Sequence, residues 1–412
     1  MKIFVVSWFY PPVTTSEAFV TYKLLSNSKN EYYLCSASSS RWSYNSKSEL
    51  ESDNIKHYTI DTDDFDEFNE RTVELYKKLS KKIKFDAIMT RSMPVEPQKA
   101  GFEIKKFDKD IPWIVSLADP IGNNPYETLY PLYKNRHGLV RRIYRYAPNF
   151  CLSFACNFVR SKETRRLSAI NRFQNKLVKK ANLIIVPTKE QGEFIVRDKQ
   201  VYNEKCLVVP HSYSKELYAK RISKNDKFVF SFIGQSDAFR SIEPVVKAIK
   251  LIKDIRPEFL DKIKVRLIGN IPNRVKNMIY VYFLQDVFSI EGSVNYFDSL
   301  KAMQESDCLI HIDALFPNLP NDSIFFAAKI ADYMGAGKPI LGITNPASPA
   351  GKMIKNAGGV VTKGEQLDLA KKIMEIVDNP PKVNEEYCKK FEAKAVAKVY
   401  DSEIERRIKN EK

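Results

Sequence analysis

Short apolar runs alternate with longer amphipathic stretches along almost the whole chain. The runs are rich in Val, Ile, Leu and Phe without strict polar alternation, which is typical of strands buried on both faces. Predicted strands form a first series at residues 3–7, 32–36, 87–90, 113–117, 183–186 and 207–210, and a second at residues 228–233, 264–268, 288–291, 308–312, 339–343 and 359–362. Helical stretches between them imply parallel pairing through crossovers. The pattern predicts an α/β protein of two doubly wound domains, with ligands at the carboxyl ends of strands in a cleft between the domains.

A polar, lysine-rich stretch at residues 212–226 separates the two series. We expect a first domain at residues 1–211, a second at residues 212–384 and a charged helical tail at residues 385–412. The tail is expected to cap the second domain or to cross back to the first.

The chain of 412 residues exceeds one ordinary core, and 44% apolar with 12% aromatic residues suffices for two cores. No apolar run reaches the roughly 18–20 residues of a membrane-spanning helix. The amino-terminal run ends at Pro11-Pro12 without a small-residue cleavage site, which favours a first buried strand over a signal peptide. The six cysteines lack metal-ligand or disulfide-scaffold spacing, so a reduced, cytoplasmic location is predicted.

The formal net charge of +16 is concentrated in one segment. Residues 134–180 contain thirteen lysines and arginines against one acid, Glu163, with aromatic and aliphatic residues interleaved. This composition favours a basic helix pair on an anionic membrane leaflet, peripheral on the inner face of the cell membrane. A solvated basic face over ordinary core residues is the alternative. Nucleic acid is disfavoured, because no recognised binding module accompanies the charge.

A further helix is predicted before residue 340. Asp322 or Ser323 can cap its start, and a Gly-Ala-Gly sequence followed by Pro339 ends it about three turns later. Lys329 and Asp332, three residues apart, share one face of this helix. A lysine near the open amides of a helix start suits a diphosphate, and a carboxylate one turn later can accept ribose hydroxyls. From spacing alone, an exposed ion pair on an amphipathic helix is favoured.

The sequence Lys329-x-x-Asp332-Tyr333-Met-x-Ala-Gly-Lys-Pro-Ile resembles the nucleotide-binding helix of glycosyltransferase family 4, in which Lys-x-x-Glu-Tyr-x-x-x-Gly-x-Pro recurs. The resemblance implies that Asp332 holds the donor ribose, although the usual residue is Glu. A second family acid, eight positions earlier, contacts the donor sugar. Ile324 stands there in this chain, so contacts to the sugar must differ. The segment is not a P-loop, because Asp332 stands where the first Gly belongs.

The resemblance continues upstream at the first strand of the second domain. It implies that Gly234 lets the backbone approach the donor and that Arg240 neutralises the diphosphate. The family's commoner Arg directly after the glycine is here Gln235. The turns that frame the base are matched by Gly269, Asn270, Ser293 and Val294.

The first domain resembles the family more weakly. Residues 112–120 resemble a stretch that ends in Arg-Asp-Pro, with Ala118 in place of the arginine before Asp119. Gln98 stands where a histidine facing the donor sugar is frequent, and the loop holding Thr14 and Thr15 lacks the paired glycines common there. The resemblance implies cleft or acceptor-side positions for Thr14, Thr15, Gln98 and Asp119.

Other chemical motifs are weak. Asp-x-Asp sequences at residues 61–63 and 64–66 match the metal site of another glycosyltransferase fold but lie in an acidic stretch expected to be a solvated loop. The four histidines show no metal-ligand spacing; His211, at the domain boundary, is expected to be structural or exposed. No serine-nucleophile elbow or Cys-His signature occurs. We therefore expect no cofactor and no metal requirement.

The resemblance implies a GT-B glycosyltransferase, with two Rossmann-like domains facing a cleft. A hexosyltransferase-like enzyme would move a sugar from a nucleoside-diphosphate sugar to a hydroxyl of a glycan or polyprenyl-linked acceptor, retaining the anomeric configuration, in cell-surface polysaccharide-type biosynthesis. Arg240 and Lys329 would stabilise the leaving group. The alternatives are a nucleotide-sugar epimerase or hydrolase of the same fold and a catalytically silent nucleotide-sugar-binding scaffold.

Overall fold

The computed structural model describes residues 1–38, 50–126, 149–219, 225–237, 239–316 and 318–409; the side chains of residues 149–163 lie outside this description. None of the described helices is both long and apolar enough to cross a membrane.

The amino-terminal half builds a parallel sheet with the strand order β3-β2-β1-β4-β5-β6-β7. Its strands are β1 (Lys2–Val6), β2 (Glu31–Ser38), β3 (Ile55–Asp61), β4 (Ala87–Ser92), β5 (Trp113–Leu117), β6 (Leu183–Val186) and β7 (Cys206–Val208). Its helices are α1 (Ser16–Ser26), α2 (Phe65–Ser80), α3 (Glu96–Phe107), α6 (Asn149–Lys180), α7 (Lys189–Ile195) and α8 (Lys199–Lys205). Strands β4, β5 and β6 are buried along their whole length, as expected of strands covered on both faces.

The carboxyl-terminal half builds a second parallel sheet with the order β10-β9-β8-β11-β12-β13. Its strands are β8 (Phe228–Ile233), β9 (Ile263–Ile268), β10 (Phe288–Glu291), β11 (Cys308–Ile312), β12 (Ile340–Ile343) and β13 (Val360–Thr362). Its α-helices are α9 (Glu243–Ile255), α10 (Asn273–Val281), α11 (Tyr296–Gln304), α12 (Ala328–Gly335), α13 (Pro349–Asn356), α14 (Gln366–Asp378), α15 (Glu385–Lys389) and α16 (Ala393–Lys409). Short 3₁₀ turns lie at η2 (Lys215–Leu217), η3 (Pro257–Lys262) and η4 (Pro320–Asp322). The two strand orders confirm the predicted doubly wound α/β class.

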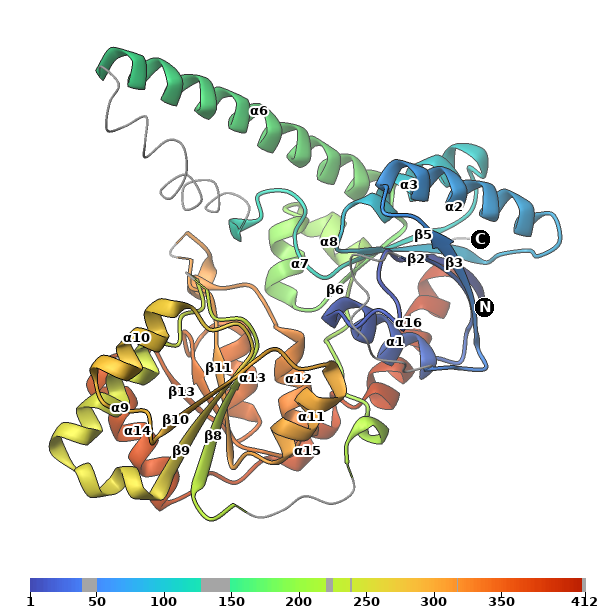
Figure 1. Ribbon diagram of the computed structural model, residues 1–412. Helices are drawn as coiled ribbons and strands as arrows, with labels where there is room; N and C mark the ends of the chain where they lie inside the picture. Colours follow the sequence, from blue (N-terminus) through green and yellow to red (C-terminus); the bar gives the residue numbers. More distant parts are fainter. Residues whose placement is uncertain (39–49, 127–148, 220–224, 238, 317, 410–412) are drawn as a thin grey trace. The chain divides into compact units, whose positions relative to one another are not determined.

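Helices cover both faces of the second sheet (Figure 1). Apolar side chains of α9, α10 and α14 pack on one face in a cluster with Phe232 and Ile310. Side chains of α11, α12, α13 and α15 pack on the other face with Ile233 and Leu309. Because neighbouring residues of a strand point to opposite faces, each strand serves both cores. Strand β11 is therefore enclosed, and a polar side chain on it is removed from water.

The chain forms two compact units. One comprises Met1–Trp8, Asp64–Val208 and Arg407–Lys412, and the other comprises Phe9–Asp63 and Val209–Arg406. The segment with α1, β2 and β3 thus packs with the carboxyl-terminal half of the chain.

Within the second unit, α16 is attached to the turn that precedes β2. The Asp401 carboxylate of α16 accepts hydrogen bonds from the Ser28 hydroxyl, the Lys29 backbone N–H and the Asn30 side-chain amide. Asp401 is 5% exposed, so these bonds replace those that water would make.

Two predicted elements differ from the observed ones. Neither Asp322 nor Ser323 caps the predicted helix: α12 begins at Ala328, and the preceding residues from Ser323 onward are not helical. This segment buries Ile324, Phe325 and Phe326, so tertiary packing overrides the local capping signal. Strand β3 was not predicted, because most of its residues are polar and partly or fully exposed.

Candidate functional site

Two glycines bring the ends of β8 and β9 together at the carboxyl edge of the second sheet. Gly234 and Gly269 have φ of +135° and +128°, which L side chains rarely adopt. The Gly234 N–H donates to the Ile268 carbonyl at 2.8 Å, and a Cβ at Gly269 would collide with the Gly234 carbonyl. This edge lies where the strand order reverses, between β8 and β11, the usual ligand position in such sheets.

Lys329 occupies the second residue of α12 and reaches this edge. Its ammonium donates to the Ile233 carbonyl at 3.0 Å and lies 2.6 Å from where a Gly234 Cβ would be. Burial, and secondarily the Arg240 charge, lower the pKa of Lys329 to about 8. Within the described residues, that carbonyl is the one hydrogen-bond partner of the ammonium, so two N–H groups are available for a ligand.

The start of α12 is open. Its N-cap residue, Ala327, has no side chain that could accept a hydrogen bond, and the Ile330 N–H already bonds the Ala327 carbonyl. The amides of Ala328 and Lys329 make no backbone hydrogen bond in the described part of the chain. Open amides with a helix dipole behind them favour an anion.

Arg240 lies in the turn after β8, where Asp237 positions it. One Asp237 oxygen accepts from the backbone N–H groups of Phe239 and Arg240, and the other accepts from the Arg240 guanidinium at 3.0 Å. The Arg240 side chain is about one-third exposed. A guanidinium carries five N–H donors in a planar fork whose geometry suits an anion such as a diphosphate.

Asp332 lies one helical turn after Lys329 but is not exposed. Its Oδ1 accepts from the Lys23 ammonium of α1 at 2.7 Å and from the Tyr296 hydroxyl at 3.0 Å. The Lys23 and Asp332 side chains are only 1% and 7% exposed. The ring of Phe19, one turn before Lys23, stacks on Tyr296 with centroids 3.8 Å apart. The expected exposed ion pair between Lys329 and Asp332 is therefore wrong: each residue has a different, buried partner.

The other oxygen of Asp332, Oδ2, has no hydrogen-bond partner among the described residues. Lys23 and Tyr296 therefore fix the carboxylate through one oxygen and leave the second able to accept a hydroxyl. The Tyr218 hydroxyl bonds the Asp332 backbone carbonyl at 2.7 Å, which further fixes this turn of α12.

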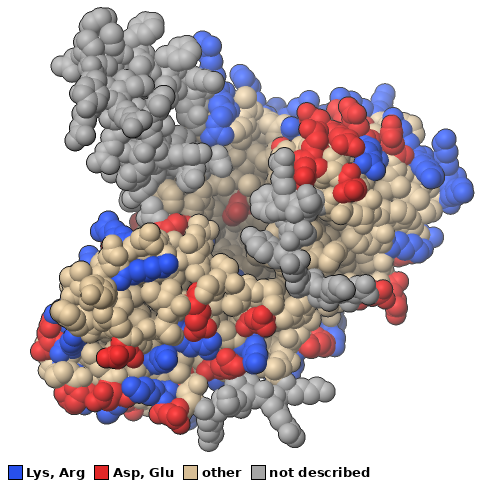
Figure 2. Space-filling model, viewed as in Figure 1, with Lys and Arg blue, Asp and Glu red and all other residues tan. Residues whose placement is uncertain are grey.

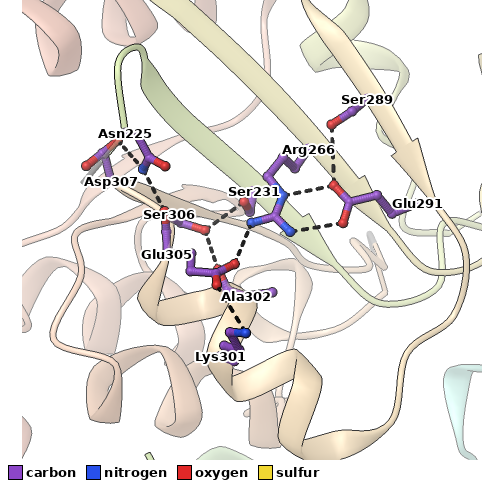
Figure 3. Close-up of polar contacts among 10 residues, drawn as sticks. All are labelled: Asn225, Ser231, Arg266, Ser289, Glu291, Lys301, Ala302, Glu305, Ser306 and Asp307. Atoms are coloured by element: carbon purple, nitrogen blue, oxygen red, sulfur yellow. Dashed lines mark hydrogen bonds and ion pairs between the residues drawn. The ribbon is translucent and has the colours of Figure 1, made fainter. Parts of the chain in front are cut away.

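A half-buried ion-pair network supports the turns predicted to frame the base (Figure 3). Arg266 on β9 donates through two nitrogens to both oxygens of Glu291 at the end of β10, each at 2.9 Å, and also pairs with Glu305. The hydrogen bond from Arg266 is the main cause that lowers the pKa of Glu291. The network joins β9 and β10 just before the predicted base-framing residues. Of these residues, Asn270, Ser293 and Val294 are exposed and Gly269 is half-buried.

The other predicted site residues occupy varied environments. Gln235 is exposed, whereas Tyr333 has no exposed surface and packs in the core, its hydroxyl 3.3 Å from the Ile310 carbonyl. Gln98 is also fully buried and bonds the Thr90 hydroxyl. A ligand contact by the Tyr333 or Gln98 side chain would therefore need rearrangement of a core.

The predicted acceptor-side residues of the two loops are half-buried. Thr15 caps α1 through a hydrogen bond from the Ala18 N–H, and Thr14 precedes it. Asp119 lies in the loop after β5. Their acceptor-side role stays a prediction.

Sequence reasoning missed three buried polar residues near this edge: Lys23, His311 and Asp313. His311 lies on β11 and Asp313 directly follows that strand. Asp313 accepts from the Thr344 hydroxyl at 3.1 Å, and burial raises its pKa to about 6. The sequence did contain a signal for His311 and Asp313, because both interrupt an apolar run. Polar side chains on a buried strand are costly unless they are hydrogen-bonded, so they often indicate a site.

The Asp-x-Asp sequences, the histidines and the cysteines were the candidates for metal binding in the sequence. Asp64 caps α2 by accepting from two backbone N–H groups, so the second Asp-x-Asp sequence includes a helix cap. The described residues contain no cluster of three or more His, Cys, Asp or Glu suited to a metal ion. His137 lies outside the described residues, and so do the side chains of Cys151 and Cys156. The other four cysteines are buried and unbridged.

Part of the basic segment 134–180 lies outside the described residues. In the described part of α6, Arg165, Arg166, Arg172, Lys176, Lys179 and Lys180 are exposed, and residues 164–180 contain no acid. Figure 2 shows blue side chains gathered along this helix.

No family model and no curated protein sequence matches this chain. Solved structures match it along its full length. Sucrose-phosphate synthase from Thermosynechococcus elongatus aligns with a TM-score of 0.65 at 13% identity, covering 100% of both chains. Trehalose-6-phosphate synthase aligns with a TM-score of 0.65 at 10% identity, covering 98% of this chain and 99% of that one. A putative UDP-N-acetylglucosamine 2-epimerase from Listeria monocytogenes aligns with a TM-score of 0.57 at 10% identity, covering 99% and 97%. The chain therefore has the two-domain GT-B fold that these glycosyltransferases and the epimerase share.

Proposed function

We propose that the protein is a glycosyltransferase that moves a sugar from a nucleoside-diphosphate sugar to a hydroxyl of a glycan or lipid-linked glycan. One observation carries the proposal. The Lys329 ammonium is held beside Gly234 at the open amino terminus of α12, at the carboxyl edge where the strand order of the second sheet reverses. A diphosphate is the ligand group that this combination of amides, cation and close backbone fits.

In the proposed reaction, the protein acts mainly on the leaving group. Negative charge develops on the nucleoside diphosphate as the glycosidic bond breaks, and Lys329, Arg240 and the α12 amides stabilise it. Asp332 Oδ2 accepts a ribose hydroxyl and so fixes the donor relative to these groups. We propose retention of configuration without a protein nucleophile and without a metal ion. Transfer that is lost on adding EDTA and restored by Mg²⁺ or Mn²⁺ would contradict the last point.

Ligand binding tests the donor site before any acceptor is known. Thermal unfolding in the presence of UDP, GDP, ADP, CDP and their sugars should reveal at least one stabilising ligand, because a ligand that binds the folded state raises the apparent stability. Lys329→Ala and Arg240→Ala should each weaken that ligand about tenfold or more, since each removes a charged hydrogen bond. Lys247→Ala, on the same unit and exposed, is the control. Unchanged affinity in both site variants would refute the donor site.

The fold shared with a UDP-N-acetylglucosamine 2-epimerase supports a second candidate, epimerisation or hydrolysis of the donor. Incubation of the protein with the identified nucleotide sugar alone distinguishes the two. Turnover without acceptor supports the second candidate, and turnover only with membrane extract supports transfer. Binding without turnover in either case supports a silent scaffold.

We further propose that the basic face of α6 binds an anionic membrane, which would bring a polyprenyl-linked acceptor of a cell-surface polysaccharide within reach. The exposed cations of α6 carry this proposal, since each contributes about 1 kcal/mol near an anionic surface. Flotation with liposomes containing anionic lipid should recover the protein, and exchange of Arg165, Arg166, Arg172 and Lys176 for Gln should reduce recovery. Exchange of the four exposed lysines of residues 77–82 is the matched control. Equal recovery with neutral liposomes would refute the electrostatic basis.

A further inference from the structure

His311 is a buried imidazole that no part of the fold explains. It lies on β11 and is 1% exposed. Neither of its ring nitrogens has a hydrogen-bond partner among the described residues. Burying a polar group without a partner destabilises a protein, so native structures rarely retain such a group without a water, ion or ligand to satisfy it.

The strand geometry places His311 beneath the start of α12. His311 points to the same face of β11 as Leu309, which packs with Ile330 of α12. The register aligns Ile310 with Phe232, so the next residue, His311, lies beside Ile233. The Ile233 carbonyl is the acceptor for the Lys329 ammonium. The imidazole, the ammonium and the open amides of α12 therefore share one corner of the sheet edge.

Burial, with a smaller contribution from nearby charges, keeps His311 neutral. Burial, then the nearby charges of Lys329 and Arg240, lower the pKa of His311 to about 3. A neutral imidazole has one N–H donor and one acceptor nitrogen. Near two cations, a neutral donor can bind an anionic oxygen without adding a third positive charge.

We propose that His311 is a diphosphate-binding residue whose neutral imidazole donates a hydrogen bond to an oxygen of the anion held by Lys329, Arg240 and the α12 amides. The proposal rests on the proposed function, because it names a further contact in the same donor site. It accounts for the unpartnered ring, which gains its acceptor when the diphosphate is present. It also assigns a role to a strand residue that is 18 positions before Lys329 in the chain.

Substitutions that remove or retain the donor test this contact. His311→Leu keeps an apolar volume without a donor, whereas His311→Asn and His311→Gln place an amide N–H near the position of one ring nitrogen or the other. Calorimetry at pH 7 should be run with inorganic pyrophosphate, the best-bound nucleoside diphosphate and the matching nucleoside. We expect His311→Leu to weaken the binding of pyrophosphate and of the nucleoside diphosphate about tenfold, because one hydrogen bond to a charged group is lost. The affinity for the nucleoside should stay unchanged. One of the amide variants should restore binding to within about threefold.

Two results would overturn the inference alone. In one, His311→Leu binds the diphosphate as tightly as the wild-type protein; in the other, it weakens the nucleoside equally, as a merely structural residue would. A wild-type protein that binds none of the diphosphates would instead refute the proposed function, and the inference with it. If His311→Leu does not fold, the ring nitrogen signals of wild-type protein labelled with ¹⁵N-histidine give the answer. The His311 signal, assigned with an amide variant, should shift on adding pyrophosphate, and an unmoved signal overturns the inference.

Discussion

Exchange of Lys23 for Met would leave the Asp332 carboxylate buried without its cation. The two side chains are 1% and 7% exposed, and their charged atoms are 2.7 Å apart. Methionine fills nearly the same volume as lysine, so the change removes charge more than packing. Breaking a buried pair by removing one partner costs about 3–5 kcal/mol, because the remaining charge has lost its hydration and gained nothing. The Tyr296 hydroxyl still donates to Asp332, which favours the lower half of that range.

Urea unfolding of the variant, followed by circular dichroism, measures the loss. Because the chain forms two compact units, hydrogen exchange of peptides from α1 and α12 should accompany it and show where protection is lost. Lys23→Met with Asp332→Asn should recover much of the stability, since the uncompensated carboxylate is then absent. Lys29→Met is the matched control, because Lys29 pairs with Glu405 at the surface and its side chain is 61% exposed; it should show no measurable change.

A loss below about 1 kcal/mol for Lys23→Met would refute the reasoning, because that is the range of a solvated surface pair. A double variant no more stable than Lys23→Met would also contradict it, since the penalty would then come from packing instead of charge.

Three further predictions concern the donor site and the attachment of α16. Gly234→Ala should weaken a nucleoside diphosphate at least about tenfold in calorimetry, because its Cβ would lie 2.6 Å from the Lys329 ammonium at a φ of +135°; Gly337→Ala, with φ of +67° and open space around it, should cost about 1–2 kcal/mol of strain and leave affinity unchanged. The pKa of Lys329 is about 8, so the ammonium loses its charge as the pH rises through 8, and the affinity for a diphosphate should fall over the same interval. Lys329→Arg should abolish this pH dependence. If the affinity of the wild-type protein stayed unchanged between pH 7 and pH 9, this prediction would be wrong. Asp401→Asn should lower the free energy of unfolding by about 1–3 kcal/mol, because an amide cannot accept all three hydrogen bonds of the turn before β2; Glu405→Gln on the same helix should leave it unchanged, and equal losses would contradict a specific role for Asp401.

Most of the fold was predictable, because a strand that is buried on both faces appears in the sequence as a continuous apolar run. Trp113–Leu117 and Phe228–Ile233 are apolar runs, and the observed strands β5 and β8 have the predicted bounds. Strand β3 was not predicted, because it lies at the sheet edge and most of its residues are polar and partly or fully exposed. The predicted start of α12 was wrong because a local signal was present but tertiary packing overrode it. Asp322 and Ser323 carry a capping pattern, but residues 323–327 are not helical, because the apolar side chains that follow Ser323 pack in the core.

The sequence by itself determined most of the strands and helices in their order along the chain and placed Gly234 directly after a strand, since apolar runs and turn glycines are local signals. The structure placed Lys329 at a helix start, because α12 begins at Ala328. Only the tertiary structure decided the partners of Asp332 and the surroundings of His311. Lys23 lies 309 positions before Asp332, and the residues around either position do not indicate that the two side chains pair. Hydrophobic periodicity tells which residues leave water, but the identity of a buried polar partner depends on how distant segments pack.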